Sequence, residues 1–182
     1  GIAAVSACIC RSLRLARVKG RVLLLGLPRP MSVSAPSRPT HSQNGRTFDA
    51  DRLRALRRYD ILDTPPEEAF DQITRLAASL LDVPYALINF IDADRQWSKS
   101  CVGVDPGDVP LEHSFCVDTI QTPGPTVVED ASSDPRFASN PFVTSDPSVR
   151  FYAGTPIETD AGERVGTICV LDSETRSVTQ EE

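Results

Sequence analysis

The side chains best suited to chemistry are the five cysteines of this 182-residue chain: Cys8, Cys10, Cys101, Cys116 and Cys169. They form no C-x-x-C pair and no cluster with histidine, so their spacing predicts neither a zinc site nor a disulfide framework. Cys101, Cys116 and Cys169 stand among apolar residues, the setting of small buried hydrophobes, and this usage indicates a reducing, cytoplasmic compartment. Cys116 could also be a redox thiol or a chromophore attachment point. Because no Lys or Arg neighbours it in the sequence to lower its pKa, a packed thiol is favoured.

Acid–base chemistry has few candidates. The two histidines are His41 and His113, and nothing in the sequence fixes His113 against the adjacent Ser114. Glycine-rich phosphate loops, H-E-x-x-H and G-x-S-x-G do not occur. We therefore predict no catalytic residues and no metal site, and expect this segment not to be an enzyme.

One charged group has two interpretations. Asp130, Asp134 and Arg136 fall within nine residues of each other. The favoured interpretation is turn and helix-cap chemistry, with Arg136 holding a carboxylate. The alternative is a loop that closes over a ligand with the same guanidinium.

The elements that must position these residues follow from hydrophobic spacing. Apolar residues recur at three- and four-residue intervals over 70–81, which predicts a helix that starts near Asp63 and Thr64 and ends near Asp82, before Pro84. An earlier short helix, capped by Asp49 or Asp51, is expected to run to Tyr59.

After the helix over 70–81 the hydrophobic pattern changes from helical to strand spacing, which predicts two hairpins. Residues 85–91 are apolar on both faces and a short turn leads into the alternating residues 96–101. A second pair, 149–157 and 164–171, closes the chain, with Gly162 at the left-handed position of its turn. Strands that are apolar on both faces need cover on both sides.

The cover must come from the helix and from the turn-rich middle, residues 102–148. This segment contains two predicted short helices, 114–119 and 134–138, and a brief strand over 126–129. Long irregular connections on a sheet commonly carry function.

Charge separates the amino-terminal part from the rest. The first 30 residues hold six basic side chains and no acidic one, whereas the whole chain has a net charge of -6. We interpret residues 1–30 as a basic arm that is non-native or resembles a targeting segment, and residues 31–47 as a disordered lead-in. The acidic remainder argues against nucleic acid as a partner, and the longest aliphatic run, 22–25, is too short to cross a membrane.

The pieces together resemble a known family. From about Arg52 to Arg176 the chain is similar to GAF domains, of the subgroup at the N-terminus of bacterial sensor histidine kinases and diguanylate cyclases. The resemblance is carried, in order, by residues 53–56, 59–65, 90–97, 114–116, 130–140, 150–154 and 166–172.

The resemblance implies an α+β, GAF/PAS-like fold over residues 48–182, with an antiparallel central sheet of five to six strands and helices on both faces. It also implies a pocket between the sheet and the middle segment, which in relatives holds cyclic nucleotides, tetrapyrroles, haem, amino acids or other effectors, so the cofactor stays unknown. The motif positions that border this pocket are Trp97, Phe115, Cys116, Asp130, Arg136, Phe137, Tyr152 and Cys169. Two departures are expected: no Cys-His pair for a covalent bilin at 111–114, and no closing helix after residue 176.

The function implied is a cytoplasmic sensory module that binds a small effector. Its expected partners are a second copy of the chain and an output signalling domain, with the terminal helices dimerising and passing on the signal. One alternative is a free methionine sulfoxide reductase of the same fold, which uses pocket cysteines. Another is a ligand-free dimerisation module.

Overall fold

A single twisted sheet organises the molecule. The computed structural model describes residues 13–18, 21–26 and 44–177. Its strands are β1 (Leu13–Val18), β2 (Arg21–Gly26), β3 (Tyr85–Ile91), β4 (Arg95–Val102), β5 (Val109–Pro110), β6 (Thr126–Val128), β7 (Phe151–Thr159) and β8 (Arg164–Asp172). The strand order is β2-β1-β7-β8-β3-β4-β5, with β6 paired to β7 as well. The six strands β3 to β8 pair antiparallel throughout, which confirms the predicted sheet.

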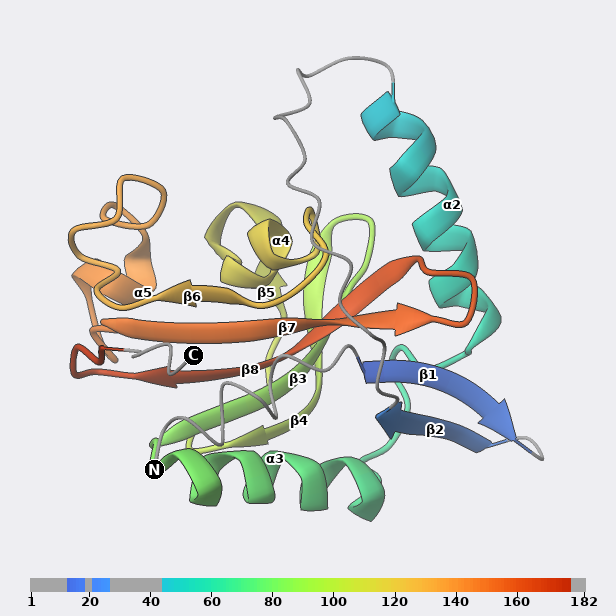
Figure 1. Ribbon diagram of the computed structural model, residues 1–182, viewed down its shortest axis with the longest axis horizontal. Coiled ribbons are helices and arrows are strands. Elements are labelled where there is room, and N and C mark those ends of the chain that lie inside the picture. The colour runs from blue at the N-terminus through green and yellow to red at the C-terminus, as the bar shows by residue number, and fades with distance from the viewer. Residues whose placement is uncertain (1–12, 19–20, 27–43, 178–182) are drawn as a thin grey trace, which may run out of the picture.

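Helices cover both faces of this sheet. They are α2 (Asn44–Arg58), α3 (Glu68–Leu81), α4 (Phe115–Thr119) and α5 (Pro141–Thr144), with a 3-10 turn, η1, at Leu111–His113. Helix α3 packs under β3 and β4, whereas α4 and α5 lie on the opposite side of the sheet (Figure 1). No helix in the described part of the chain is both long and apolar enough to cross a bilayer.

The central strands lie where hydrophobic patterning placed them. Strand β3 has the predicted bounds, and it pairs with β8 from Tyr85↔Leu171 to Phe90↔Gly166. The turn between β7 and β8 has Gly162 at φ +92°, the left-handed conformation that glycine tolerates without strain. Helix α3 ends at Leu81 with Asp82 as its C-cap, close to the end predicted from the proline that follows.

The amino-terminal arm contributes two strands to the sheet. Residues 1–30 contain β1 and β2, an antiparallel pair of which β1 adds to β7 in parallel. Its aliphatic runs, which flank a two-residue Lys-Gly link, favour strands. The other residues of the arm lie outside the described residues.

Helix boundaries differ in three further places. Helix α2 begins at Asn44, inside the predicted lead-in 31–47, of which residues 31–43 lie outside the described residues. Helix α3 begins at Glu68 rather than near Asp63, and the non-helical residues before it, Thr64 and Pro65, accept hydrogen bonds from Lys99. Residues 135–139 form turns, and the short helix lies just beyond, at α5, where Asn140 caps it.

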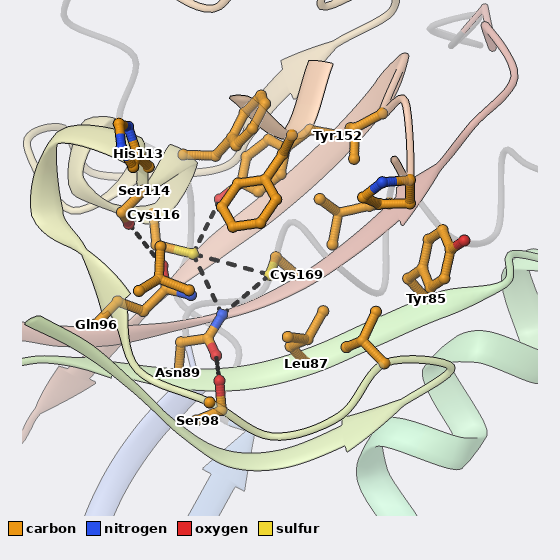
Figure 2. Close-up of a pocket in the computed structure, with 18 of the residues that line it drawn as sticks. Tyr85, Leu87, Asn89, Gln96, Ser98, His113, Ser114, Cys116, Tyr152 and Cys169 are labelled. Atoms are coloured by element: carbon orange, nitrogen blue, oxygen red, sulfur yellow. Dashed lines mark hydrogen bonds between the residues drawn. The ribbon is translucent and has the colours of Figure 1, made fainter. Parts of the chain in front are cut away.

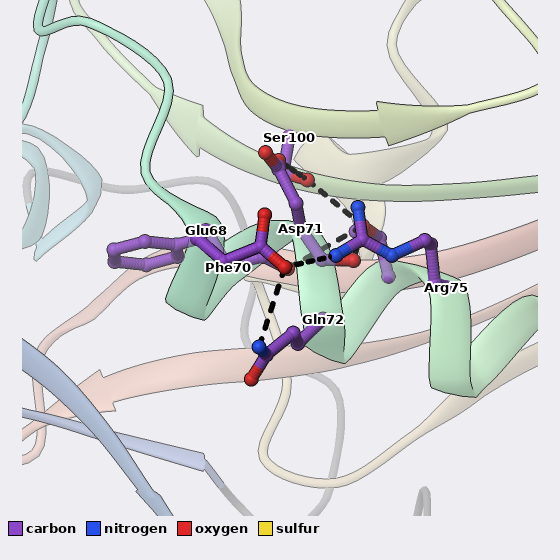
Figure 3. Close-up of polar contacts among 7 residues, drawn as sticks. Glu68, Phe70, Asp71, Gln72, Arg75 and Ser100 are labelled. Carbon is purple, nitrogen blue, oxygen red and sulfur yellow. Dashed lines mark hydrogen bonds and ion pairs between the residues drawn. The ribbon is translucent and has the colours of Figure 1, made fainter.

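Helix α3 is joined to β4 by a buried polar contact. The Ser100 hydroxyl donates to Asp71 Oδ1 at 2.6 Å and shares a second hydrogen bond, of 2.8 Å, with the Thr74 hydroxyl (Figure 3). On the solvent side of the same helix, Glu68 accepts from Gln72 and Arg75. The first contact fixes the helix on the sheet, because satisfied polar groups in a low-dielectric setting interact strongly.

Lys99 gives a prediction about this face. Its side chain is fully buried, and its ammonium donates to Thr64 Oγ1 at 2.7 Å and to the Pro65 carbonyl at 2.8 Å, and pairs with Glu67 at 2.7 Å. We expect Lys99→Met to lower the free energy of unfolding by about 2 kcal/mol, since it leaves these acceptors without their charged donor. Urea unfolding measures the change. Arg75→Met is the matched control: its ion pair with Glu68 is solvent-exposed, so a loss below about 0.5 kcal/mol is expected, and equal losses would contradict the argument.

Candidate ligand pocket

A pocket of about 310 Å³ lies between the sheet and the middle segment. Its floor comes from β3, β4, β7 and β8, and its roof from residues 104–109, 113–116 and 142–149. The predicted arrangement, in which the strands at Tyr85 and Ile168 share a sheet roofed by the middle segment around a hollow, is therefore confirmed.

Strand periodicity decides which side chains reach the floor. Tyr85, Leu87 and Asn89 alternate along β3 and line the pocket, while Ile88 and Phe90 point to the α2 and α3 side. The pairing of β3 with β4 shifts between Ile88 and Asn89, and this bulge sets Ser98 opposite Asn89. Figure 2 shows Asn89 directed from β3 toward the roof.

The roof is tied to the sheet by specific hydrogen bonds. Ser114 caps α4 by accepting from the Val117 amide, and its hydroxyl donates to Gln96 Oε1 at 2.6 Å. Asn140 caps α5 and donates to the His113 carbonyl at 2.9 Å. Because each contact joins a helix cap to another element, α4 and α5 hold fixed positions over the floor.

Two cysteines meet at the inner wall. Cys116 Sγ of α4 lies 3.8 Å from Cys169 Sγ of β8, although 53 positions separate them. The Asn89 amide nitrogen lies 3.4 Å from the first sulfur and 3.5 Å from the second. The amide is oriented by the Ser98 hydroxyl, which donates to Asn89 Oδ1 at 2.8 Å (Figure 2).

The thiols of Cys116 and Cys169 influence each other's ionisation. A hydrogen bond from the Cys169 thiol lowers the pKa of Cys116, with further help from Thr167, Asn89 and Tyr152, and this outweighs the effect of burial. The pKa of Cys169 is raised well above its usual value, because the thiol donates to Cys116, is buried and would face a neighbouring negative charge. A single thiolate, centred on Cys116, is the ionised form that this wall favours.

Tyr152 forms the back of the pocket. Its ring stacks on Phe115 with centroids 5.2 Å apart, and its hydroxyl lies 2.7 Å from Thr119 Oγ1 and 3.7 Å from Cys116 Sγ. A Cβ atom at Gly154 would lie 2.2 Å from the Tyr152 hydroxyl oxygen. The space over the strand at Gly154 is therefore what allows the tyrosine to lie there.

The structure brings together four of the eight predicted site residues. Phe115, Cys116, Tyr152 and Cys169 line the pocket. Phe137 stacks on Phe115 at 4.3 Å from outside the lining.

The other three predicted residues lie away from it. Trp97 packs with Phe90 and Ile88 on the opposite face of the sheet, because strand alternation directs its neighbours Gln96 and Ser98 into the pocket instead. Asp130 accepts from the Ser132 amide and hydroxyl, and Arg136 donates to Asp134 on an exposed loop. The turn interpretation of this loop accounts for both residues.

Several lining residues were missed, among them Asn89, Gln96, Ser98 and His113. The available signal was Asn89, a lone amide in an otherwise apolar buried strand. A buried polar side chain needs partners, and those partners mark the site.

Comparison with known proteins shows which family and which folds this chain resembles. The GAF domain profile matches residues 65–182. A cyclic di-GMP phosphodiesterase from Pseudomonas aeruginosa is 40% identical over 116 residues, which cover 64% of this chain and 20% of that protein. This chain thus spans a fifth of that relative's length.

Solved structures agree on the fold. The GAF domain of a phosphoenolpyruvate-protein phosphotransferase from Coxiella burnetii matches with a TM-score of 0.52 and 14% identity, over 74% of this chain and 83% of that one. A free methionine-R-sulfoxide reductase from Neisseria meningitidis matches with a TM-score of 0.50 and 14% identity, over 79% and 81% of the two chains. At such identities the likeness concerns the fold alone.

Proposed function

We propose that this chain, which belongs to the GAF domain family, is the small-molecule-binding sensory module of a bacterial signalling protein. The observation that carries the proposal is the pocket of about 310 Å³, whose apolar walls and few inward-facing polar groups are typical of ligand sites. A sensor histidine kinase, a diguanylate cyclase or a cyclic di-GMP phosphodiesterase like the Pseudomonas relative would use such a module.

The charge of the lining favours an uncharged effector. Among the described residues that line the pocket, none is Lys or Arg, and its carboxylates are Asp105 and Asp108. Asp108 is paired with Arg95 at 2.6 Å. A phosphate-bearing ligand would find no lysine or arginine of the described lining to bind and would meet the negative charge of Asp105.

The polar groups suggest how such an effector would be oriented. Gln96 lines the pocket and uses its Oε1 to accept from Ser114, so the donors that its side chain can offer an effector are its amide N–H groups. Leu87, Leu171 and Phe142 supply apolar contacts elsewhere on the lining. An apolar body with one hydrogen-bond acceptor, such as an aromatic amide, suits this arrangement.

Filling the pocket tests the proposal. Thermal unfolding of the full chain is followed with benzamide as the uncharged probe and cyclic AMP as the anionic probe. We expect benzamide to raise Tm, with a stabilisation of about 1.4 kcal/mol at ten times its Kd, and cyclic AMP to have no effect. In Leu87→Trp, whose larger ring occupies the pocket, the benzamide effect should disappear.

The matched control is Leu76→Trp, because Leu76 is 59% exposed on α3 and far from the lining. It should keep the full benzamide response. Stabilisation by cyclic AMP but not by benzamide would contradict the uncharged class. Dimerisation without response to either probe would favour the ligand-free dimerisation module.

Signal output is the second part of the proposal. Effector binding would shift the domain between two arrangements, and the terminal helices of a homodimer would carry the change to an output domain.

An enzymatic alternative, free methionine sulfoxide reductase, is favoured by the two sulfurs in contact at the pocket wall. Thiol-dependent consumption of free methionine sulfoxide that Cys116→Ser abolishes would favour the reductase over the sensor.

A further inference from the structure

We propose that Cys116 and Cys169 form a dithiol site at which a hydroperoxide is reduced and an intramolecular disulfide is formed. This site does not depend on which effector fills the pocket. The two sulfurs are already in contact at 3.8 Å, and a disulfide requires them to approach by about 1.8 Å more, which rotation of the two side chains supplies.

The polar surroundings of the pair are those of a reactive thiol. Both cysteines are buried at 2% exposure, yet the sulfurs lie within reach of the Asn89 amide and, for Cys116, the Tyr152 hydroxyl. The Thr167 hydroxyl is also buried and has no hydrogen-bond partner of ordinary geometry within the described part of the chain. These groups stabilise a thiolate without any neighbouring cation.

The pocket provides the route of access. Cys116 and Cys169 belong to its lining, so a small uncharged oxidant such as hydrogen peroxide reaches the sulfurs without unfolding of the core. Cys101 lies outside this lining, and burial together with Asp71 and Asp105 raises the pKa of its thiol. It is therefore not part of the proposed site and can be replaced without removing either partner.

The chemistry balances in two displacements. The Cys116 thiolate attacks one peroxide oxygen, the O–O bond breaks, and with one proton taken up the products are a sulfenic acid and water. The Cys169 sulfur then attacks the sulfenic sulfur, loses its own proton and displaces the hydroxyl group as a second water. Two thiols are oxidised to one disulfide, and one hydroperoxide is reduced by two electrons.

The test uses the full chain carrying Cys101→Ser. Trypsin leaves positions 101 and 116 in one peptide, 100–136, so this background removes the ambiguity, while Cys169 falls in peptide 165–176. The reduced protein is treated with hydrogen peroxide, its remaining thiols are alkylated in denaturant, and the digest is mapped by mass spectrometry. We expect a cross-link between the two peptides that forms at least about tenfold faster in the folded chain than in urea.

Two variants and one pocket mutant sharpen the result. With Cys169→Ser, dimedone should trap a sulfenic acid at Cys116, whereas with Cys116→Ser the remaining Cys169 should stay reduced. Leu87→Trp should slow the cross-link several-fold. The proposal is overturned if Cys116 and Cys169 stay alkylatable after other thiols are oxidised, if folded and unfolded chains cross-link equally fast, or if Cys116 pairs with Cys8 or Cys10. The cross-link is measured without any effector, and benzamide binding is a separate readout, so failure here is distinguishable from failure of the proposed sensor.

Discussion

Alanine at position 166 should lower the free energy of unfolding by about 3 kcal/mol, the cost expected when a well-packed interior is overfilled by a group that cannot be accommodated. Gly166 lies on β8 between β3 and β7, opposite Phe90 and Ile157. A Cβ atom there would lie 2.2 Å from the Asn89 carbonyl oxygen and 2.9 Å from Phe90 Cδ1. The carbonyl belongs to the backbone of the neighbouring strand, so relief requires the two strands to separate.

Such a separation would also disturb the pocket. The carbonyl belongs to Asn89, whose side-chain amide contacts the Cys116 and Cys169 sulfurs. Denaturant unfolding followed by the fluorescence of Trp97, the single tryptophan, measures the loss of stability. Gly107→Ala is the control, since a Cβ atom at that position would meet nothing within 4 Å. A Gly166→Ala protein as stable as Gly107→Ala would show that β3 and β8 are not packed as described.

Truncation of Tyr152 to alanine should cost about 4 kcal/mol, within the range observed for removal of large buried aromatic side chains. The residue is fully buried, stacks on Phe115 and bonds to Thr119. Its loss removes apolar contact on one side of Phe115 and leaves a cavity continuous with the pocket, which the surrounding sheet is unable to close.

Tyr152→Phe separates the ring from its hydroxyl. It should cost only about 1 kcal/mol, because the ring contacts remain and only the hydroxyl's hydrogen bond to Thr119 and its longer contact with Cys116 are lost. The same unfolding measurement compares both variants with wild type. Equal losses for phenylalanine and alanine would mean that the hydroxyl, and not the ring, holds this wall of the pocket.

Local information in the sequence was enough for much of the scaffold. The run of β3, apolar on both faces, predicted its bounds, Pro84 predicted the end of α3, and Gly162 predicted the hairpin turn. The Asp134–Arg136 contact joins residues two positions apart, so the spacing alone favoured a turn over a ligand clamp. These features depend on neighbours along the chain, which is why a single sequence reveals them.

The composition of the pocket wall is set by contacts between residues far apart in the chain. Cys116 and Cys169 meet only because β8 pairs with β3 in one register, with Cys169 opposite Leu87, and because Ser114 and Gln96 fix α4 above that point. The bulge after Ile88 decides that Ser98 faces Asn89, and the same alternation turns Trp97 to the other side.

The sequence by itself thus determined the central strands β3, β4, β7 and β8, the helix α3 and the roofed antiparallel sheet that they form. The tertiary structure alone decided which thiols touch, that no described lysine or arginine lines the pocket, and that β1 extends the sheet. The physical reason is that periodicity records whether a side chain is buried, whereas its partner is set by strand register and by hydrogen bonds between residues far apart in the chain.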